Sequence, residues 1–123
     1  MDIRRFQERV RGWMADCFGA VISSDRVERN HRFLEEALEL VQATGCTASE
    51  AHQLVDYVYG RPVGHPPQEV GGVLVTLAAH CLAHGIDMED AAKTEMTRIE
   101  APAVRDKIRA KQAAKPKHSP LPA

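Results

Sequence analysis

The stretch FLEEALEL, residues 33–40, places three glutamates, Glu35, Glu36 and Glu39, inside an otherwise apolar helical segment. On a helical wheel of about 100° per residue, Glu36 and Glu39 share one edge of the apolar stripe, while Glu35 is displaced outward. Their β-carbons are then about 5–6 Å apart. This spacing suits two carboxylates that bind one hard cation, although a solvated helix edge has the same pattern.

The segments on either side of this stretch predict an all-α fold. Aromatic residues make up only 5% of the 123 residues, and Ala, Val and Leu supply most of the 44% hydrophobic content. Such a composition favours packed helices over a β-sandwich or barrel. We expect a compact bundle of about five helices, whose approximate ranges are 2–17, 24–44, 47–60, 67–84 and 87–100.

Several local signals mark where these helices begin and end. Thr47 and Glu50 have the spacing of a capping box, and Gly45 and Gly85 can each supply the left-handed residue that ends a helix. Pro102 should bend or end the last helix.

The chain is long enough for one domain with its own core. We expect this domain at residues 1–112, followed by a flexible, basic and Pro-rich tail at 113–123. Residues 101–123 contain six Lys and Arg against one acid, so the remainder has a net charge of −6. The tail could be a solvated terminus, or it could contact phosphates or an acidic partner.

Cysteine usage and hydropathy bear on the compartment. Cys17, Cys46 and Cys81 are far apart in the sequence and odd in number, which indicates neither a zinc knuckle nor a disulfide framework. The chain has no apolar signal segment, and no apolar run approaches the roughly 20 residues of a membrane span. We therefore expect a soluble cytoplasmic protein without a membrane partner.

A second acidic position lies in the most apolar predicted helix, residues 67–84. Glu69, Thr76 and His80 fall within about 40° of one line on the wheel. If this helix is buried, Glu69 must be paired, protonated or bound to a metal, because desolvating a lone carboxylate costs several kcal/mol. Glu36, Glu39 and Glu69 could then share one Mg²⁺ or Mn²⁺ ion.

The order of these two acidic helices has a counterpart in a known family. FLEEALELVQA, followed by QEVGGVLVTLAAHCLAHGIDMEDA, resembles the MazG-like all-α nucleotide pyrophosphohydrolases, whose signature is an EExxE helix and then an ExxD helix. The resemblance covers roughly residues 28–95. It implies a magnesium-dependent hydrolase that converts a ribo- or deoxyribonucleoside triphosphate to the monophosphate and pyrophosphate. It also implies a homodimer or homotetramer.

Site residues follow from the resemblance position by position. Glu36, Glu39 and Glu69 correspond to metal ligands, and Glu35 to a further ligand or to the group that orients the attacking water. The aspartate of ExxD is replaced by Gly72. This replacement is consistent with fewer bound ions, with a water or Asp56 in place of the missing carboxylate, or with a protein that binds nucleotide without hydrolysing it.

Five further residues are candidates for substrate binding. Trp13 could stack on a base, although a single Trp is also a typical core residue. Asn30 lies on the apolar stripe of its helix, where a buried amide would either fix a loop or read a base edge. Arg29, Lys107 and Lys111 could contact triphosphate oxygens.

Two alternatives to an enzyme remain. One is a catalytically impaired nucleotide-binding protein, for which Gly72 is the main observation. The other is a nucleic-acid-binding or interaction module that uses the basic tail. The acidic body of the chain argues against nucleic acid, because a phosphate-binding surface needs a basic patch.

Overall fold

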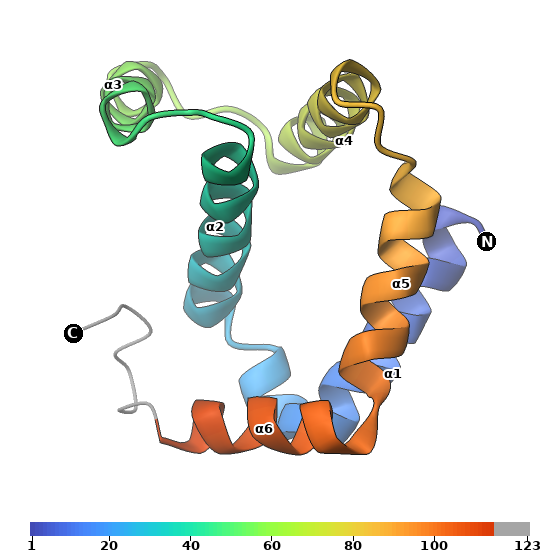
Figure 1. The fold of residues 1–123 in the computed structure, drawn as a ribbon. Helices are drawn as coiled ribbons and strands as arrows, with labels where there is room; N and C mark the ends of the chain where they lie inside the picture. Colours follow the sequence, from blue (N-terminus) through green and yellow to red (C-terminus); the bar gives the residue numbers. More distant parts are fainter. Residues whose placement is uncertain (115–123) are drawn as a thin grey trace. The chain divides into compact units, whose positions relative to one another are not determined.

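The computed structural model describes residues 1–114, and this part of the chain is all-helical (Figure 1). It contains six helices: α1 (Ile3–Ser23), α2 (Arg26–Ala43), α3 (Ala48–Tyr59), α4 (Pro66–Ala83), α5 (Met88–Glu100) and α6 (Pro102–Ala113). The all-α prediction is confirmed, but the expected number of helices was one too few. The predicted flexibility of the tail falls mostly outside the described residues.

The sixth helix begins at the proline that was expected to bend or end the fifth. Pro102 is the first residue of α6, where its missing N–H costs no hydrogen bond and its fixed φ suits a helix. Val104 and Ile108, one turn apart, are half-buried on this helix. Pro102 therefore separates two helices.

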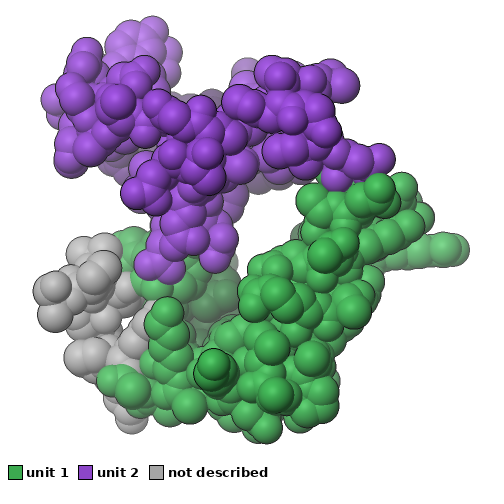
Figure 2. All heavy atoms as spheres, viewed as in Figure 1, with its two compact units in different colours: residues 1–32, 88–123 green, residues 33–87 purple. Residues whose placement is uncertain are grey.

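The chain divides into two compact units, which Figure 2 colours separately: residues 1–32 with 88–123, and residues 33–87. We call them unit 1 and unit 2. The expectation of a single domain at residues 1–112 stays a prediction. Within the described residues, no single helix is both long and apolar enough to cross a membrane.

Unit 1 joins the two ends of the chain through α1, α5 and α6. The Met1 amino group lies 3.0 Å from Glu89, and Arg9 Nη2 lies 2.7 Å from Glu100 Oε1, so α1 and α5 run side by side in the same direction. Cys17 and Met96 are buried, with 2% and 3% of their surfaces exposed. Burial raises the pKa of the Cys17 thiol.

A break in α1 is stabilised by a residue from the far end of the chain. Gly19, with φ 78° and ψ 169°, interrupts the helix and deprives the preceding carbonyls of their usual donors. Arg109 of α6 donates from Nη2 to the Asp16 carbonyl at 2.6 Å and from Nε to the Cys17 carbonyl at 3.2 Å. Its guanidinium thus acts as a C-terminal cap for the first part of α1.

Unit 2 contains the rest of α2 with α3 and α4, and its turns are built alike. After α2, Cys46 N–H donates to the Val41 carbonyl at 2.8 Å, and Gly45 has φ 97°. Forty residues later, Ile86 N–H donates to the Cys81 carbonyl at 2.9 Å, and Gly85 has φ 65°. Both are left-handed glycine caps, as predicted.

The predicted capping box is also confirmed. The Thr47 hydroxyl accepts from Glu50 N–H at 3.1 Å, and the Glu50 carboxylate accepts from Thr47 N–H at 2.9 Å. These hydrogen bonds fix the start of α3 and lower the pKa of Glu50.

The two turns that end α2 and α4 form a structural repeat. Residues 43–46, ATGC, and residues 83–86, AHGI, each end a helix with a left-handed glycine. The sequence pattern had not indicated this repeat.

Unit 2 buries little apolar surface. Of its described side chains only Cys81 is buried, at 7% exposure. Val75, Leu82 and Tyr59 are 69%, 83% and 85% exposed. On α2, Leu34 and Leu38 are 52% and 43% exposed. The apolar stripes read from the sequence are present, but this unit supplies few surfaces to cover them.

We expect Arg109→Met to lower the free energy of unfolding by about 1–2 kcal/mol, because it leaves the Asp16 and Cys17 carbonyls without their charged donor. Urea denaturation followed by circular dichroism measures this change. Lys107→Met, an exposed change on the same helix, is the matched control and should shift the free energy by less than about 0.5 kcal/mol. Equal effects of the two substitutions would contradict the capping role.

The pairing of Arg9 with Glu100 makes unit 1 sensitive to acid. Two hydrogen bonds from Arg9, of 3.0 Å and 2.7 Å, lower the pKa of Glu100. A carboxyl whose pKa is lower in the folded state stabilises the fold above its unfolded pKa, about 4.3, and this contribution is lost as the pH falls through the folded pKa.

Glu100→Gln should therefore lower the urea midpoint at pH 7, and its difference from the natural protein should shrink as the pH falls below about 4. The control is Glu8→Gln, which removes an exposed ion pair to Arg11 of 3.2 Å. A Glu100→Gln difference that stays constant with pH would show that the ion pair is not its cause.

Candidate functional site

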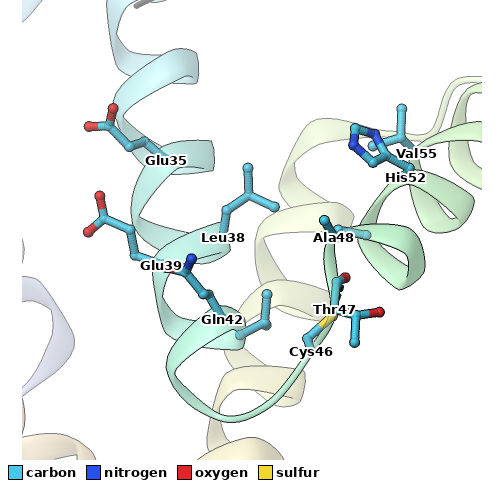
Figure 3. Close-up of a pocket in the computed structure, with 11 residues that line it drawn as sticks. Glu35, Leu38, Glu39, Gln42, Cys46, Thr47, Ala48, His52 and Val55 are labelled. Atoms are coloured by element: carbon cyan, nitrogen blue, oxygen red, sulfur yellow. Dashed lines mark hydrogen bonds between the residues drawn. The ribbon is translucent and has the colours of Figure 1, made fainter.

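Two glutamates of α2, Glu35 and Glu39, line a groove between α2 and α3, entirely within unit 2 (Figure 3). The groove has a volume of about 370 Å³. It is positioned by the Gly45 turn and the Thr47 capping box, which connect the end of α2 to the start of α3. It is lined by Glu35, Leu38, Glu39, Val41, Gln42, Cys46, Thr47, Ala48, Ala51, His52 and Val55.

The groove is lined mainly by apolar side chains, and two glutamates of α2 are among its lining residues. Leu38, Val41 and Ala51 supply apolar surface, whereas Glu35 and Glu39 extend from one side of α2 and away from α3 (Figure 3). These two glutamates are one helical turn apart, so their carboxylates can approach the same ligand. The volume of the groove, and its mainly apolar lining with a small number of polar groups, fall within the range of small-molecule sites.

The structure groups the glutamates differently from the sequence analysis. Glu36 was expected to share an edge with Glu39, but Glu36 is exposed and does not line the groove. Glu35, which was expected to be displaced outward, is half-buried and lies at the groove with Glu39. The roles predicted for all three glutamates stay predictions.

Glu69 has another environment than the one expected. It is the fourth residue of α4, and it is exposed rather than buried. Its carboxylate folds back over Gly64, in the loop that precedes the helix. Because Glu69 is exposed, the cost of burying a charge gives no reason for it to bind a metal. Thr76, on the same predicted line, donates to the Gly72 carbonyl at 2.8 Å.

The predicted metal ligands do not converge within the described part of one chain. In residues 1–114, no three His, Cys, Asp or Glu side chains come close enough to hold an ion. Glu35, Glu36, Glu39 and Glu69 nevertheless all belong to unit 2, and their carboxylate oxygens are the ligands that Mg²⁺ and Mn²⁺ prefer. The donors fit such an ion by their chemistry.

Two other side chains bear on metal binding. The imidazole rings of His80 and His84 lie at the end of α4 with their centroids 4.5 Å apart and their planes tilted by 45°. Among the described residues, no third ligand for zinc joins them. Asp56, the possible replacement for the missing ExxD carboxylate, is exposed on α3.

The candidate base-stacking residue Trp13 is held within unit 1. Its indole N–H donates to the Ile99 carbonyl at 3.0 Å, and its ring meets Phe18 edge-on at 5.6 Å. The guanidinium of Arg29 lies 5.8 Å from the centre of the Phe18 ring. These contacts give Trp13 a packing role in the junction of α1 and α5.

The other substrate-binding candidates also lie in unit 1. Asn30 was expected on a buried stripe, but it is exposed. Lys107 and Lys111 are exposed one turn apart on α6, while the arginines of that helix, Arg105 and Arg109, lie closer to α1. Because the glutamates belong to unit 2, assembly of all these residues into one site stays a prediction.

Sequence reasoning missed the one buried carboxylate of the described chain. Glu28, 6% exposed, lies with its Oε1 3.3 Å from Arg32 Nε and 3.9 Å from Arg29 Nη2. The four-residue spacing of Glu28 and Arg32 could have indicated this pair. His52 and Gln42 at the groove were also missed, and no pattern in the sequence indicates them.

Comparison with known proteins does not assign the chain to a family. No protein-family model matches it, and neither the curated proteins nor the solved structures show significant similarity to it.

Proposed function

We propose that the protein is a metal-dependent nucleoside triphosphate pyrophosphohydrolase that resembles the MazG-like enzymes. The observation that carries this proposal is the order of carboxylates in unit 2. Glu35 and Glu39 line a groove of about 370 Å³ beside α2, Glu36 lies next to them in the sequence, and Glu69 follows in the first turn of a second helix.

In the proposed reaction, water attacks the α phosphorus of a nucleoside triphosphate, the bond to the bridging oxygen breaks, and pyrophosphate leaves. Glu36, Glu39 and Glu69 would hold Mg²⁺ or Mn²⁺, which neutralises phosphate charge and lowers the pKa of bound water. Glu35 would orient the attacking water and accept its proton. Arg29, Asn30, Trp13, Lys107 and Lys111 are the candidates for contacts to the nucleotide.

A protein that binds nucleotide without hydrolysing it is the second candidate, and Gly72 favours it. The position that holds aspartate in the signature has no side chain here. A Cβ at Gly72 would meet nothing within 4 Å, so the structure of one chain has room for the missing carboxylate.

The proposed oligomer rests on the exposed apolar side chains of unit 2. A monomer rarely leaves a large contiguous apolar surface exposed. The most exposed large side chains of α4 are Val75 and Leu82, at 69% and 83%. We propose that a second copy of the chain covers these side chains in a homodimer or homotetramer.

The first experiment incubates the purified full chain with ribo- and deoxyribonucleoside triphosphates and Mg²⁺ or Mn²⁺, and separates the products. We expect monophosphate and pyrophosphate in equal amounts, and a loss of about 100-fold or more in rate for Glu39→Gln. Glu95→Gln, which changes a surface carboxylate paired with Arg98 at 2.7 Å, is the matched control and should keep full activity.

Gly72→Asp distinguishes the two candidates. In an enzyme that lacks one ligand, the new carboxylate should tighten Mn²⁺ binding and raise the rate, whereas Gly71→Asp, with equal room but another helical direction, should do neither. Tight nucleotide binding by the natural protein without turnover, and with turnover gained only in Gly72→Asp, would instead support the binding protein.

The oligomer is tested by light scattering after size exclusion. We expect a mass that is two or four times 13.6 kDa for the natural protein. A double substitution of α4, Val75→Lys with Leu82→Lys, should lower this mass, because it places charge in the proposed interface. Val21→Lys, on an 85% exposed side chain of unit 1, is the control, and a monomeric natural protein would overturn the proposal.

A further inference from the structure

The carboxylate of Glu69 lies over the loop between α3 and α4. Glu69 N–H donates to the His65 carbonyl at 3.0 Å, which fixes its backbone against the end of the loop. Its side chain then folds back over Gly64. A Cβ built on Gly64 would lie 3.1 Å from Glu69 Cδ and 3.4 Å from Cγ, with Oε1 closer still.

The loop itself has few conformations available. Its sequence from residue 61, RPVGHPP, contains Pro62, Pro66 and Pro67, each with a fixed φ. His65, which precedes a proline, is extended with φ −99° and ψ 121°, as expected for such a residue. Glu69 therefore lies against a stiff segment of backbone.

The backbone at Gly64 does not itself require glycine. The glycines with positive φ are Gly19, Gly45 and Gly85, and Gly64 is not among them. Alanine could adopt the same backbone conformation. The close neighbour of its added methyl group would be the flexible end of Glu69, which can move at little cost to the fold.

We propose that Gly64 is a positioning residue for Glu69. Because Gly64 has no side chain, the Glu69 carboxylate can lie over the loop, where fewer rotamers are open to it. The Glu69 side chain then loses less conformational entropy when it binds a divalent cation. The proposal rests on the proposed function, in which Glu69 is a metal ligand. Gly64 touches neither metal nor substrate and acts only through Glu69.

The test measures Mn²⁺ affinity by electron paramagnetic resonance of the free ion, together with the melting temperature, in full-length protein. Gly64→Ala should weaken Mn²⁺ binding about tenfold, as a change in the support of a metal ligand typically does, with the melting temperature unchanged. The matched control is Gly71→Ala, because a Cβ there meets nothing within 4 Å. It should leave Mn²⁺ affinity unchanged.

A double-mutant cycle separates this inference from the proposed function. Once Glu69→Gln has removed the ligand, adding Gly64→Ala should weaken Mn²⁺ binding no further. If Glu69→Gln weakens binding but Gly64→Ala does not, or if Gly64→Ala has the same effect in both backgrounds, the positioning role is wrong and the proposed function stands. If Glu69→Gln leaves Mn²⁺ affinity unchanged, the metal-ligand assignment of Glu69 is wrong, and the role of Gly64 fails with it.

Discussion

The hydrogen bonding of helix ends is the constraint on which the rest of this structure depends. Gly19, Gly45 and Gly85 are the glycines with positive φ, and each one stops or interrupts a helix. A helix that stops leaves carbonyl groups without donors, and those groups must be satisfied within a few residues or from elsewhere in the chain. At Gly45 and Gly85 the following residues satisfy them, whereas at Gly19 the donor is Arg109.

This difference explains which parts of the fold could be predicted from the sequence. The caps at Gly45, Gly85 and Thr47 involve neighbouring residues, so their signals are local and were read correctly. The role of Arg109 depends on a residue 92 positions away, and no local pattern indicates it. The sixth helix had a readable signal, because a proline that follows the end of one helix is also typical of the first position of another, where Pro102 lies.

The candidate site was predicted less well, because a helical wheel shows which side of a helix a residue lies on but not whether another surface buries that side. The wheel placed Asn30 on an apolar stripe, and Glu69 was expected on a buried helix, but both residues are exposed in the structure. Whether a stripe is buried depends on the surface opposite it, which one sequence does not reveal. The contact of Glu69 with Gly64 likewise depends on a rotamer and a loop conformation, and neither has a sequence pattern.

Unit 1 combines α1 with helices that follow residue 87, and this has a consequence for biosynthesis. The hydrogen bonds between α1 and the last two helices span 86 to 93 residues, so α1 leaves the ribosome long before its partners exist. At about 5–20 residues per second, this delay is roughly 4–19 s. During that time the apolar side chains of residues 33–87 also emerge, while the N-terminal helix still lacks α5 and α6. The apolar side chains of α1 that pack against α5 and α6 therefore stay uncovered until those two helices have emerged.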